Sequence, residues 1–172
     1  IYVKRFVEER ELTIMLMVDL SASLRFGSVA QTKRDVAAEL AALLAFSAVK
    51  NNDRVGLILF TDRVEKFVAP KKGRKHVLRL ITEILTFRPE HAGTQISDAL
   101  GYLSRVLRRK AIAFLMSDFQ VPVGTFDHAL RIVARRHDLV PVVVRDAMEE
   151  ELPSMGLVLM EDLETGAPIW VD

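Results

Sequence analysis

The sequence predicts one α/β domain, a three-layer sandwich with a mostly parallel central sheet and one antiparallel edge strand. Two observations carry this prediction. Short apolar runs, typical of strands buried on both faces, alternate with longer segments of helical periodicity, as in parallel sheets covered by helices. Only Thr61–Arg63 separates two of the apolar runs, which is too short for a crossover helix and therefore predicts an antiparallel hairpin.

Five short apolar runs are predicted strands: residues 12–19, 54–60, 64–69, 111–116 and 139–144. All but the third are interpreted as buried. Pro70 is expected to end the third strand, and Pro141 removes one hydrogen-bond donor from the fifth. A closing hairpin is predicted from residues 156–160 and 169–171. Residues 1–10 mix apolar and charged side chains and are interpreted as an extended lead-in.

Four segments of helical periodicity are predicted helices: residues 32–49, 75–86, 95–108 and 126–136. In the first helix, the apolar face is assigned to residues at helical spacing: Val36, Leu40, Leu43, Leu44 and Ser47. Alanines fill much of the rest of that helix, and their small side chains let a helix lie close to a sheet. Thr94 or Ser97 is expected to cap the third helix.

Length and composition limit the number of domains and the kinds of binding partner that can be expected. The 172 residues are about one domain's worth, and residues 1–172 are treated as one domain. A formal net charge of +1 gives no overall field that favours nucleic acid or an anionic membrane. Basic clusters at 71–75 and 105–110 are interpreted as solvated helix ends and loops rather than a binding patch. His76, His128 and His137 are likewise interpreted as surface residues.

The absence of cysteine excludes disulfides, thiolate catalysis and cysteine-based zinc sites, and it fits a cytoplasmic location. No apolar run approaches the roughly 20 residues that span a bilayer, so no membrane contact is expected from this segment. The chain begins at Ile1 rather than Met, and we therefore expect a fragment of a longer protein that could be membrane-associated through its remainder.

Oxygen-bearing side chains follow two of the predicted strands and open one helix. Asp19-x-Ser21-x-Ser23 follows the first strand, Asp118 follows the strand at 111–116, and Thr94 opens the third helix. Open α/β sheets bind ligands at carboxyl strand ends where the strand order reverses, so these side chains are expected to converge. Oxygen ligands of this kind suit Mg²⁺, and an incomplete set leaves a position for a carboxylate from a ligand.

The same residues carry a resemblance. Asp-x-Ser-x-Ser, a distant Thr and a later Asp after a strand resemble the metal ion-dependent adhesion site of von Willebrand factor A domains, which have a Rossmann-like fold. The chain is more similar still to the bacterial family of unknown function number fifty-eight. The stretches that match are Leu-Met-Val-Asp-Leu-Ser-Ala-Ser, Asp-Arg-Val-Gly-Leu-Ile-Leu-Phe, Ala-Gly-Thr-Gln-Ile and Phe-Leu-Met-Ser-Asp-Phe.

This resemblance implies a role for each of the five residues. Ser21, Ser23 and Thr94 would bind Mg²⁺, Mn²⁺ or Ca²⁺ directly or nearly so, and Asp19 and Asp118 would act directly or through water. It also implies a protein-binding module without catalysis, whose partner supplies a carboxylate. That module would work beside a MoxR-type AAA+ ATPase in the assembly or activation of other proteins.

Two other functions stay open. Asp19 could serve a Mg²⁺-dependent phosphotransfer or hydrolytic enzyme, but the haloacid dehalogenase pattern needs a second aspartate where Ser21 stands. The chain also has neither a Gly-x-Ser-x-Gly elbow nor a Gly-x-x-x-x-Gly-Lys loop. Alternatively, the loop could be a metal-free turn in a structural scaffold. Asp98 could face the site, although acids are common in the first turn of a helix.

Overall fold

The computed structural model describes residues 11–27, 31–146, 149, 158–161 and 166–171. Its strands are β1 (Thr13–Asp19), β2 (Arg54–Phe60), β3 (Val64–Lys71), β4 (Ile112–Ser117), β5 (Asp138–Val143), β6 (Val158–Glu161) and β7 (Pro168–Val171). Its helices are α1 (Lys33–Lys50), α2 (Arg74–Thr86), α3 (Ile96–Val106) and α4 (Asp127–Arg136), with short 3₁₀ turns η1 (Ala22–Arg25) and η2 (Val123–Thr125). The predicted lead-in at 1–10 lies outside the described residues, as do residues 156, 157 and 165 of the closing hairpin.

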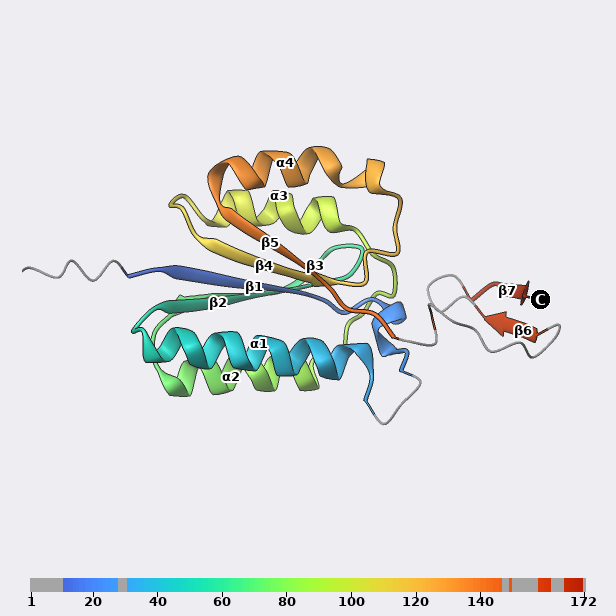
Figure 1. The fold of residues 1–172 in the computed structure, drawn as a ribbon, viewed down its shortest axis with the longest axis horizontal. Coiled ribbons are helices and arrows are strands. Elements are labelled where there is room, and N and C mark those ends of the chain that lie inside the picture. The colour runs from blue at the N-terminus through green and yellow to red at the C-terminus, as the bar shows by residue number, and fades with distance from the viewer. Residues whose placement is uncertain (1–10, 28–30, 147–148, 150–157, 162–165, 172) are drawn as a thin grey trace, which may run out of the picture.

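The sheet has the predicted mostly parallel arrangement. Its strand order is β3-β2-β1-β4-β5, and β3 alone runs antiparallel, as the hairpin partner of β2. Helices α1 and α2 cover one face and α3 and α4 the other (Figure 1). The three-layer sandwich is therefore confirmed, and β1 and β4 are neighbours at the point where the strand order reverses, as predicted.

Strand β1 divides its side chains between two cores because successive residues of a strand point to opposite faces. Leu16 and Val18 belong to the core under α1 and α2. Met15 and Met17 belong to the core under α3 and α4. Both sets are almost fully buried, which explains the unbroken apolar run and fixes β1 as the central strand.

Helix α1 begins and ends close to its predicted bounds, and two residues of the assigned face, Leu40 and Leu44, pack partly buried against the core, but alanines make up most of the buried face. The buried residues are alanines at helical spacing, together with Lys33: Ala37, Ala38, Ala41, Ala45 and Ala48. Val36 and Leu43 are 43% and 69% exposed, so their assignment to the buried face was wrong. The alanine face packs because a helix with small side chains can lie close to a twisted sheet.

Three further predictions are corrected at the edges of the fold. Strand β3 continues past Pro70 to Lys71, because an edge strand tolerates a missing donor. Strand β5 is the opposite edge strand, so it is largely exposed rather than buried. His137 is buried, with neither ring nitrogen hydrogen-bonded within the described residues, and this burial lowers the pKa of its imidazole.

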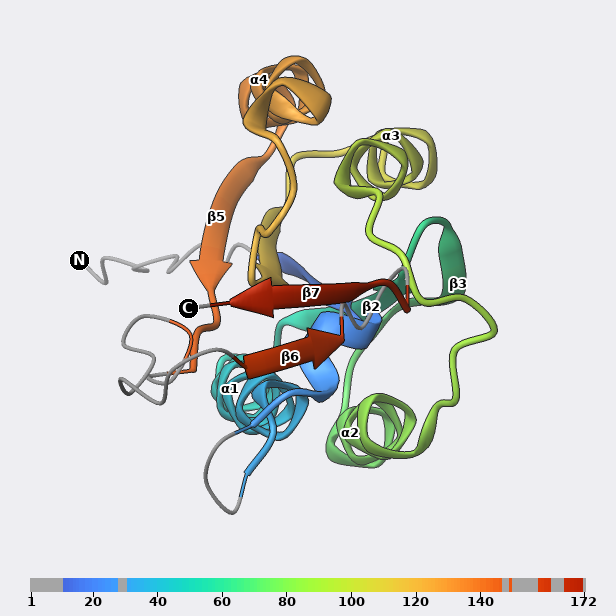
Figure 2. The same cartoon turned by 90° about the vertical axis from the view of Figure 1, so that its right-hand side faces the viewer.

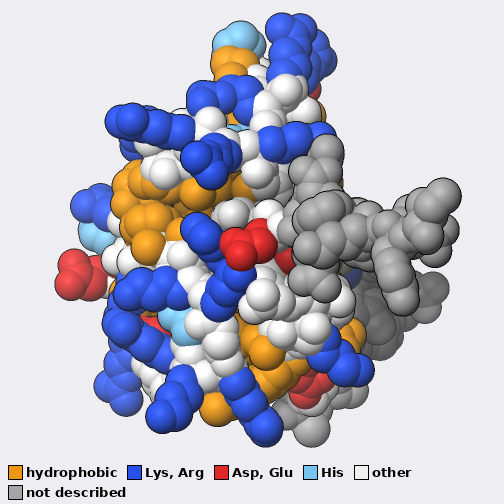
Figure 3. Space-filling model, turned by 90° about the vertical axis from the view of Figure 1, so that its left-hand side faces the viewer, with side chains coloured by type: hydrophobic (Ala, Val, Ile, Leu, Met, Phe, Trp, Pro, Cys, Tyr) orange, Lys and Arg blue, Asp and Glu red, His pale blue; other side chains and the backbone are white. Residues whose placement is uncertain are grey.

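The amino ends of the parallel strands carry many basic side chains. The basic clusters at 71–75 and 105–110 both lie at the amino ends of the parallel strands, because β3 ends there, α2 begins there and β4 begins there. Figure 3 views this end and shows Lys and Arg side chains spread across it. Most of these residues are exposed, in agreement with the prediction of solvated helix ends. The hairpin β6–β7 lies beyond the opposite end (Figures 1 and 2).

Candidate metal centre

The predicted site residues lie at the carboxyl end of the central strands. Asp19 is the last residue of β1, and the pairing of Val18 with Met116 places it beside Ser117 at the end of β4. The following loop is fixed by backbone bonds, since the Leu20 amide donates to the Phe60 carbonyl. Asp19 therefore lies at the end of the central strand, in a fixed position rather than in a mobile turn.

The carboxylate of Asp19 is fully buried and accepts a hydrogen bond at each oxygen. The Ser21 amide donates to Oδ1 over 2.8 Å, and the Ser117 hydroxyl donates to Oδ2 over 2.6 Å. Burial raises the pKa of Asp19 to about 6, and the charge of Asp118 adds to this, while the bonds from Ser117 and Ser21 lower it. The bonds do not fully offset the cost of burying the charge, so the carboxylate would gain from a nearby cation.

The two serines of the loop present adjacent hydroxyls. Ser21 Oγ and Ser23 Oγ lie 3.1 Å apart, and the two residues are 0% and 9% exposed. Ser23 lies inside η1, which places both side chains on one side of the tight turn. Two oxygens at this separation can bind a single ion, because the ligands of an octahedral Mg²⁺ site lie about 3 Å from one another at a metal–oxygen distance of roughly 2.1 Å.

Asp118 follows β4 and is held from two sides. Its Oδ1 accepts from the Gln120 amide over 3.3 Å, and its Oδ2 accepts from Lys33 Nζ over 2.8 Å. The next residue, Phe119, has a φ of 55°, a left-handed conformation uncommon for a bulky side chain. Non-glycine residues in this region concentrate at functional sites.

Lys33 and Glu149 join the site, and sequence reasoning missed both. Lys33 Nζ donates to Asp118 Oδ2 and, over 2.6 Å, to Glu149 Oε1. The side chains of Lys33 and Asp118 are each 1% exposed, and that of Glu149 is 21% exposed. Nothing in the local sequence marks these contacts, since Lys33 reads as an ordinary residue in the first turn of α1. Its partners lie 85 and 116 residues away.

Thr94 lies in a loop that is tied to the serine loop. The Ala22 amide donates to the Ala92 carbonyl, and the Gln95 amide donates to the Thr61 carbonyl, each over 2.8 Å. The structure thus brings the backbone on both sides of Thr94 to the carboxyl end of β1 and β2. The capping prediction was wrong, because α3 begins after Gln95, which makes no side-chain cap bond.

The donor chemistry fits a hard divalent cation. The candidate ligands are carboxylate and hydroxyl oxygens, which suit Mg²⁺, Mn²⁺ or Ca²⁺ better than Zn²⁺. Within the described residues, no three His, Cys, Asp or Glu side chains are grouped closely enough to hold a metal. Any ion here would therefore depend on the serine and threonine hydroxyls. It would also have to share Asp118 with the ammonium of Lys33.

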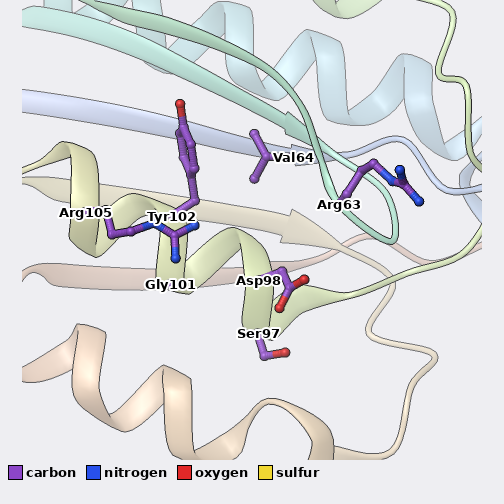
Figure 4. Close-up of a pocket in the computed structure, with 7 residues that line it drawn as sticks. All are labelled: Arg63, Val64, Ser97, Asp98, Gly101, Tyr102 and Arg105. Carbon is purple, nitrogen blue, oxygen red and sulfur yellow. The ribbon is translucent and has the colours of Figure 1, made fainter.

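Asp98 does not face this group. It is exposed and lines a pocket of about 410 Å³ between α3 and the β2–β3 hairpin, whose other lining residues are Arg63, Val64, Ser97, Gly101, Tyr102 and Arg105. Figure 4 shows Arg63 and Val64 on the hairpin side of this pocket and the remaining side chains on α3. None of the five predicted metal ligands lines it.

Comparison with known proteins places the chain in a family. A family model described as "Protein of unknown function DUF58" matches residues 1–172. The chain belongs to the DUF58 family. The uncharacterized protein Rv1480 of Mycobacterium tuberculosis is 33% identical over 167 residues, which cover 96% of this chain and 52% of that protein. The DUF58 chain described here thus spans about half the length of this relative.

Solved structures confirm the fold. An aerotolerance-related membrane protein from Bacteroides fragilis matches with a TM-score of 0.68 and 17% identity, over 93% of this chain and 81% of that one. The SpRpn10 VWA domain matches with a TM-score of 0.50 and 15% identity, over 78% and 89%. The predicted von Willebrand factor A-like architecture is therefore confirmed for this DUF58 chain. Among its described residues, no helix has both the length and the apolar character needed to cross a bilayer.

Proposed function

We propose that this domain is a protein-binding module that uses a divalent cation held in a metal ion-dependent adhesion site. The observation that carries the proposal is the environment of Asp19. This carboxylate is fully buried at the carboxyl end of β1, its pKa is raised to about 6, and the Ser21 and Ser23 hydroxyls follow it in a tight turn. A buried carboxylate beside two adjacent hydroxyl oxygens supports a cation site rather than a catalytic nucleophile.

The side chains divide the work of binding. Ser21, Ser23 and Thr94 would hold Mg²⁺, or Mn²⁺ or Ca²⁺, through their hydroxyl oxygens, while Asp19 and Asp118 would act directly or through water. When bound, the cation would supply an open coordination position for a carboxylate of the partner protein. The bonds from Ser117 and the Ser21 amide keep Asp19 oriented, and the fixed β-sheet behind it keeps the site in one shape.

A binding role is preferred to phosphotransfer or hydrolysis by Asp19. A nucleophilic carboxylate must reach its substrate, whereas Asp19 is 0% exposed and both of its oxygens already accept hydrogen bonds. In addition, Ser21 occupies the position where that chemistry would require a second acid, and a hydroxyl is a poor general acid at neutral pH.

The finer part of the proposal rests on what the resemblance to this family implies. We place the domain beside a MoxR-type AAA+ ATPase, with the metal-bridged partner being the protein that is assembled or activated. ATP-driven remodelling fits the cytoplasmic side of a membrane, and one structural neighbour is described as an aerotolerance-related membrane protein. No nucleic-acid partner is proposed, because the formal net charge is only +1.

Calorimetric titration with Mg²⁺ and Mn²⁺ tests the metal site. The wild-type chain should bind, Ser21→Ala should lose most of the affinity, and Ser47→Ala should bind as the wild type does. Ser47 provides a matched control because it is an exposed serine on α1, away from the site. Absence of binding in millimolar metal, or equal binding by Ser21→Ala, would refute the assigned ligands.

Capture of proteins from the native host tests the partner. Immobilised wild-type domain should retain a partner in Mg²⁺ and release it on addition of a chelator, and Ser21→Ala should not retain it. A bound set that is the same with and without chelator would show that the contact does not run through the metal.

A further inference from the structure

The candidate metal centre already contains a cation that belongs to the chain. Lys33 Nζ lies 2.8 Å from Asp118 Oδ2 and 2.6 Å from Glu149 Oε1, and the lysine side chain is 1% exposed. A lysine is seldom buried to this extent unless it is paired, because an ammonium group loses its hydration on burial. Here two carboxylates from distant parts of the sequence replace that hydration.

The position of the ammonium conflicts with occupancy by a divalent ion. Asp118 is one of the carboxylates assigned to the metal, and the same oxygen, Oδ2, already accepts from Lys33. Its other oxygen accepts from the Gln120 amide. A doubly charged cation close to Asp118 would therefore be repelled by Lys33 and would compete with it for the same carboxylate.

We propose that Lys33 is the built-in counter-cation of this site, and that a divalent metal binds by displacing its ammonium from Asp118. The inference rests on the proposed metal-binding function. Displacement moves Nζ away from Asp118 and so weakens its bond to Glu149, which lies after β5 in the chain. Metal binding is thereby coupled to the contacts between Asp146 and Glu149.

The bonds around Glu149 define what this coupling changes. The Glu149 amide donates to the Asp146 carbonyl over 3.1 Å, and the Asp146 amide donates to Glu149 Oε2 over 3.4 Å. Each carboxylate oxygen of Glu149 thus accepts one hydrogen bond, Oε1 from Lys33 Nζ and Oε2 from the Asp146 amide. Once Lys33 leaves, the carboxylate loses the stronger of these two contacts, and the Asp146 amide becomes more exposed to exchange with solvent.

The direction in which Lys33→Met changes the Mg²⁺ affinity distinguishes competition with the metal from a role in which Lys33 only holds Asp118 in place. If Lys33 competes with the metal, Lys33→Met removes the competitor and should raise Mg²⁺ affinity by about tenfold or more, as expected for loss of a like charge a few ångströms away. If Lys33 instead holds Asp118 in place for the metal, the same substitution should lower the affinity. Lys50→Met, an exposed change in the last turn of the same helix, is the matched control and should change nothing.

A double variant with the same net charge as the wild type tests whether metal binding is coupled to the contacts of Glu149, apart from the effect of the charge of Lys33. Lys33→Met alone leaves Asp118 and Glu149 without their shared cation and is expected to reduce stability. Lys33→Met/Glu149→Gln removes one positive and one negative charge, so the sum of charges around the site equals that of the wild type. In the wild type, Mg²⁺ should speed hydrogen exchange at the Asp146 amide; in the double variant, exchange there should not respond to Mg²⁺.

The experiment combines Mg²⁺ titration by calorimetry with hydrogen exchange on the wild-type chain and these variants. Wild-type binding that becomes tighter in Lys33→Met supports the displacement. Wild-type binding that is unchanged or weaker in Lys33→Met overturns the displacement and leaves the proposed function standing. Wild-type Mg²⁺ binding without any change in exchange at Asp146 overturns the coupling. Absence of binding by both chains overturns the inference and the proposed function together.

Discussion

The raised pKa of Asp19 predicts an unusual pH dependence of stability. Its carboxyl group has a pKa of about 6 in the folded chain against an ordinary value of 3.8, so the folded state holds its proton more tightly than the unfolded state. Stability therefore falls as the pH rises through the window from 3.8 to 6. The full penalty above this window is about 3 kcal/mol, from roughly 1.4 kcal/mol for each pH unit of the difference.

Asp19→Asn isolates this effect because the amide does not titrate. From pH 4.5 to pH 7.5, linkage should remove about 2 kcal/mol of stability from the wild type that the variant keeps. The variant also loses one of the two hydrogen bonds accepted from Ser117 and the Ser21 amide, at a cost of about 1 kcal/mol that is the same at both pH values. Because linkage has already removed about 1 of the 3 kcal/mol by pH 4.5, Asp19→Asn should be about as stable as the wild type at pH 4.5 and about 2 kcal/mol more stable at pH 7.5.

Urea unfolding at the two pH values, in chelator, measures this difference, because every other titrating group is present in both chains and cancels. Ser117→Ala provides a second arm. Removing the hydroxyl that donates to Asp19 Oδ2 should raise the pKa of Asp19 further and enlarge the loss of stability with rising pH. A free-energy difference between Asp19→Asn and wild type that stays constant from pH 4.5 to pH 7.5 would refute the reasoning.

Two further predictions concern the scaffold. Thr32→Ala breaks the capping box at the start of α1, where the Thr32 hydroxyl accepts from the Asp35 amide and the Asp35 carboxylate accepts from the Thr32 amide, so urea unfolding should show a loss of about 1 kcal/mol. An unchanged urea midpoint would contradict that assignment. Gly56→Ala would place a Cβ 2.8 Å from Met15 Cε in the centre of the sheet, and thermal unfolding should show destabilisation of about 1–3 kcal/mol. An equally stable variant would mean that the Met15 side chain moves aside at little cost.

Hydrophobic periodicity and the turn-forming residues in the sequence were sufficient to predict the strands, the helices and their layers. The strand at β1 could be predicted because it is central, and a central strand must be apolar on both faces. The antiparallel pairing of β2 and β3 could be predicted because Thr61–Arg63 leaves room for a turn only. The closeness of Asp19 and Asp118 followed from chain order, since the reversal of strand order places β1 beside β4.

Other features depend on tertiary context that the sequence does not display. The buried face of α1 was assigned to the larger apolar residues, but the distance between helix and sheet selects the alanines and leaves Leu43 in solvent. The edge position of β5 depends on which strand lies next to it, which apolar content alone does not reveal. The contact of Lys33 with Asp118 joins residues 85 apart, and a lysine in the first turn of a helix is ordinarily solvated.

The ammonium of Lys33 also bears on how a domain with the proposed metal site could fold before it binds an ion. Two buried carboxylates at one end of a sheet repel each other and favour a metal-bound fold over a metal-free one. In this chain the two carboxylates have different partners. Lys33 neutralises the charge of Asp118. Asp19 accepts only from neutral donors, the Ser117 hydroxyl and the Ser21 amide, and its pKa stays raised. Lys33 thereby stabilises the buried Asp118 without a metal, and under the proposed function the driving force for cation binding would be concentrated at Asp19. Under the proposed function, a site built in this way would bind its ion by exchange with Lys33 rather than by completing the fold, which would suit a reversible contact with a partner.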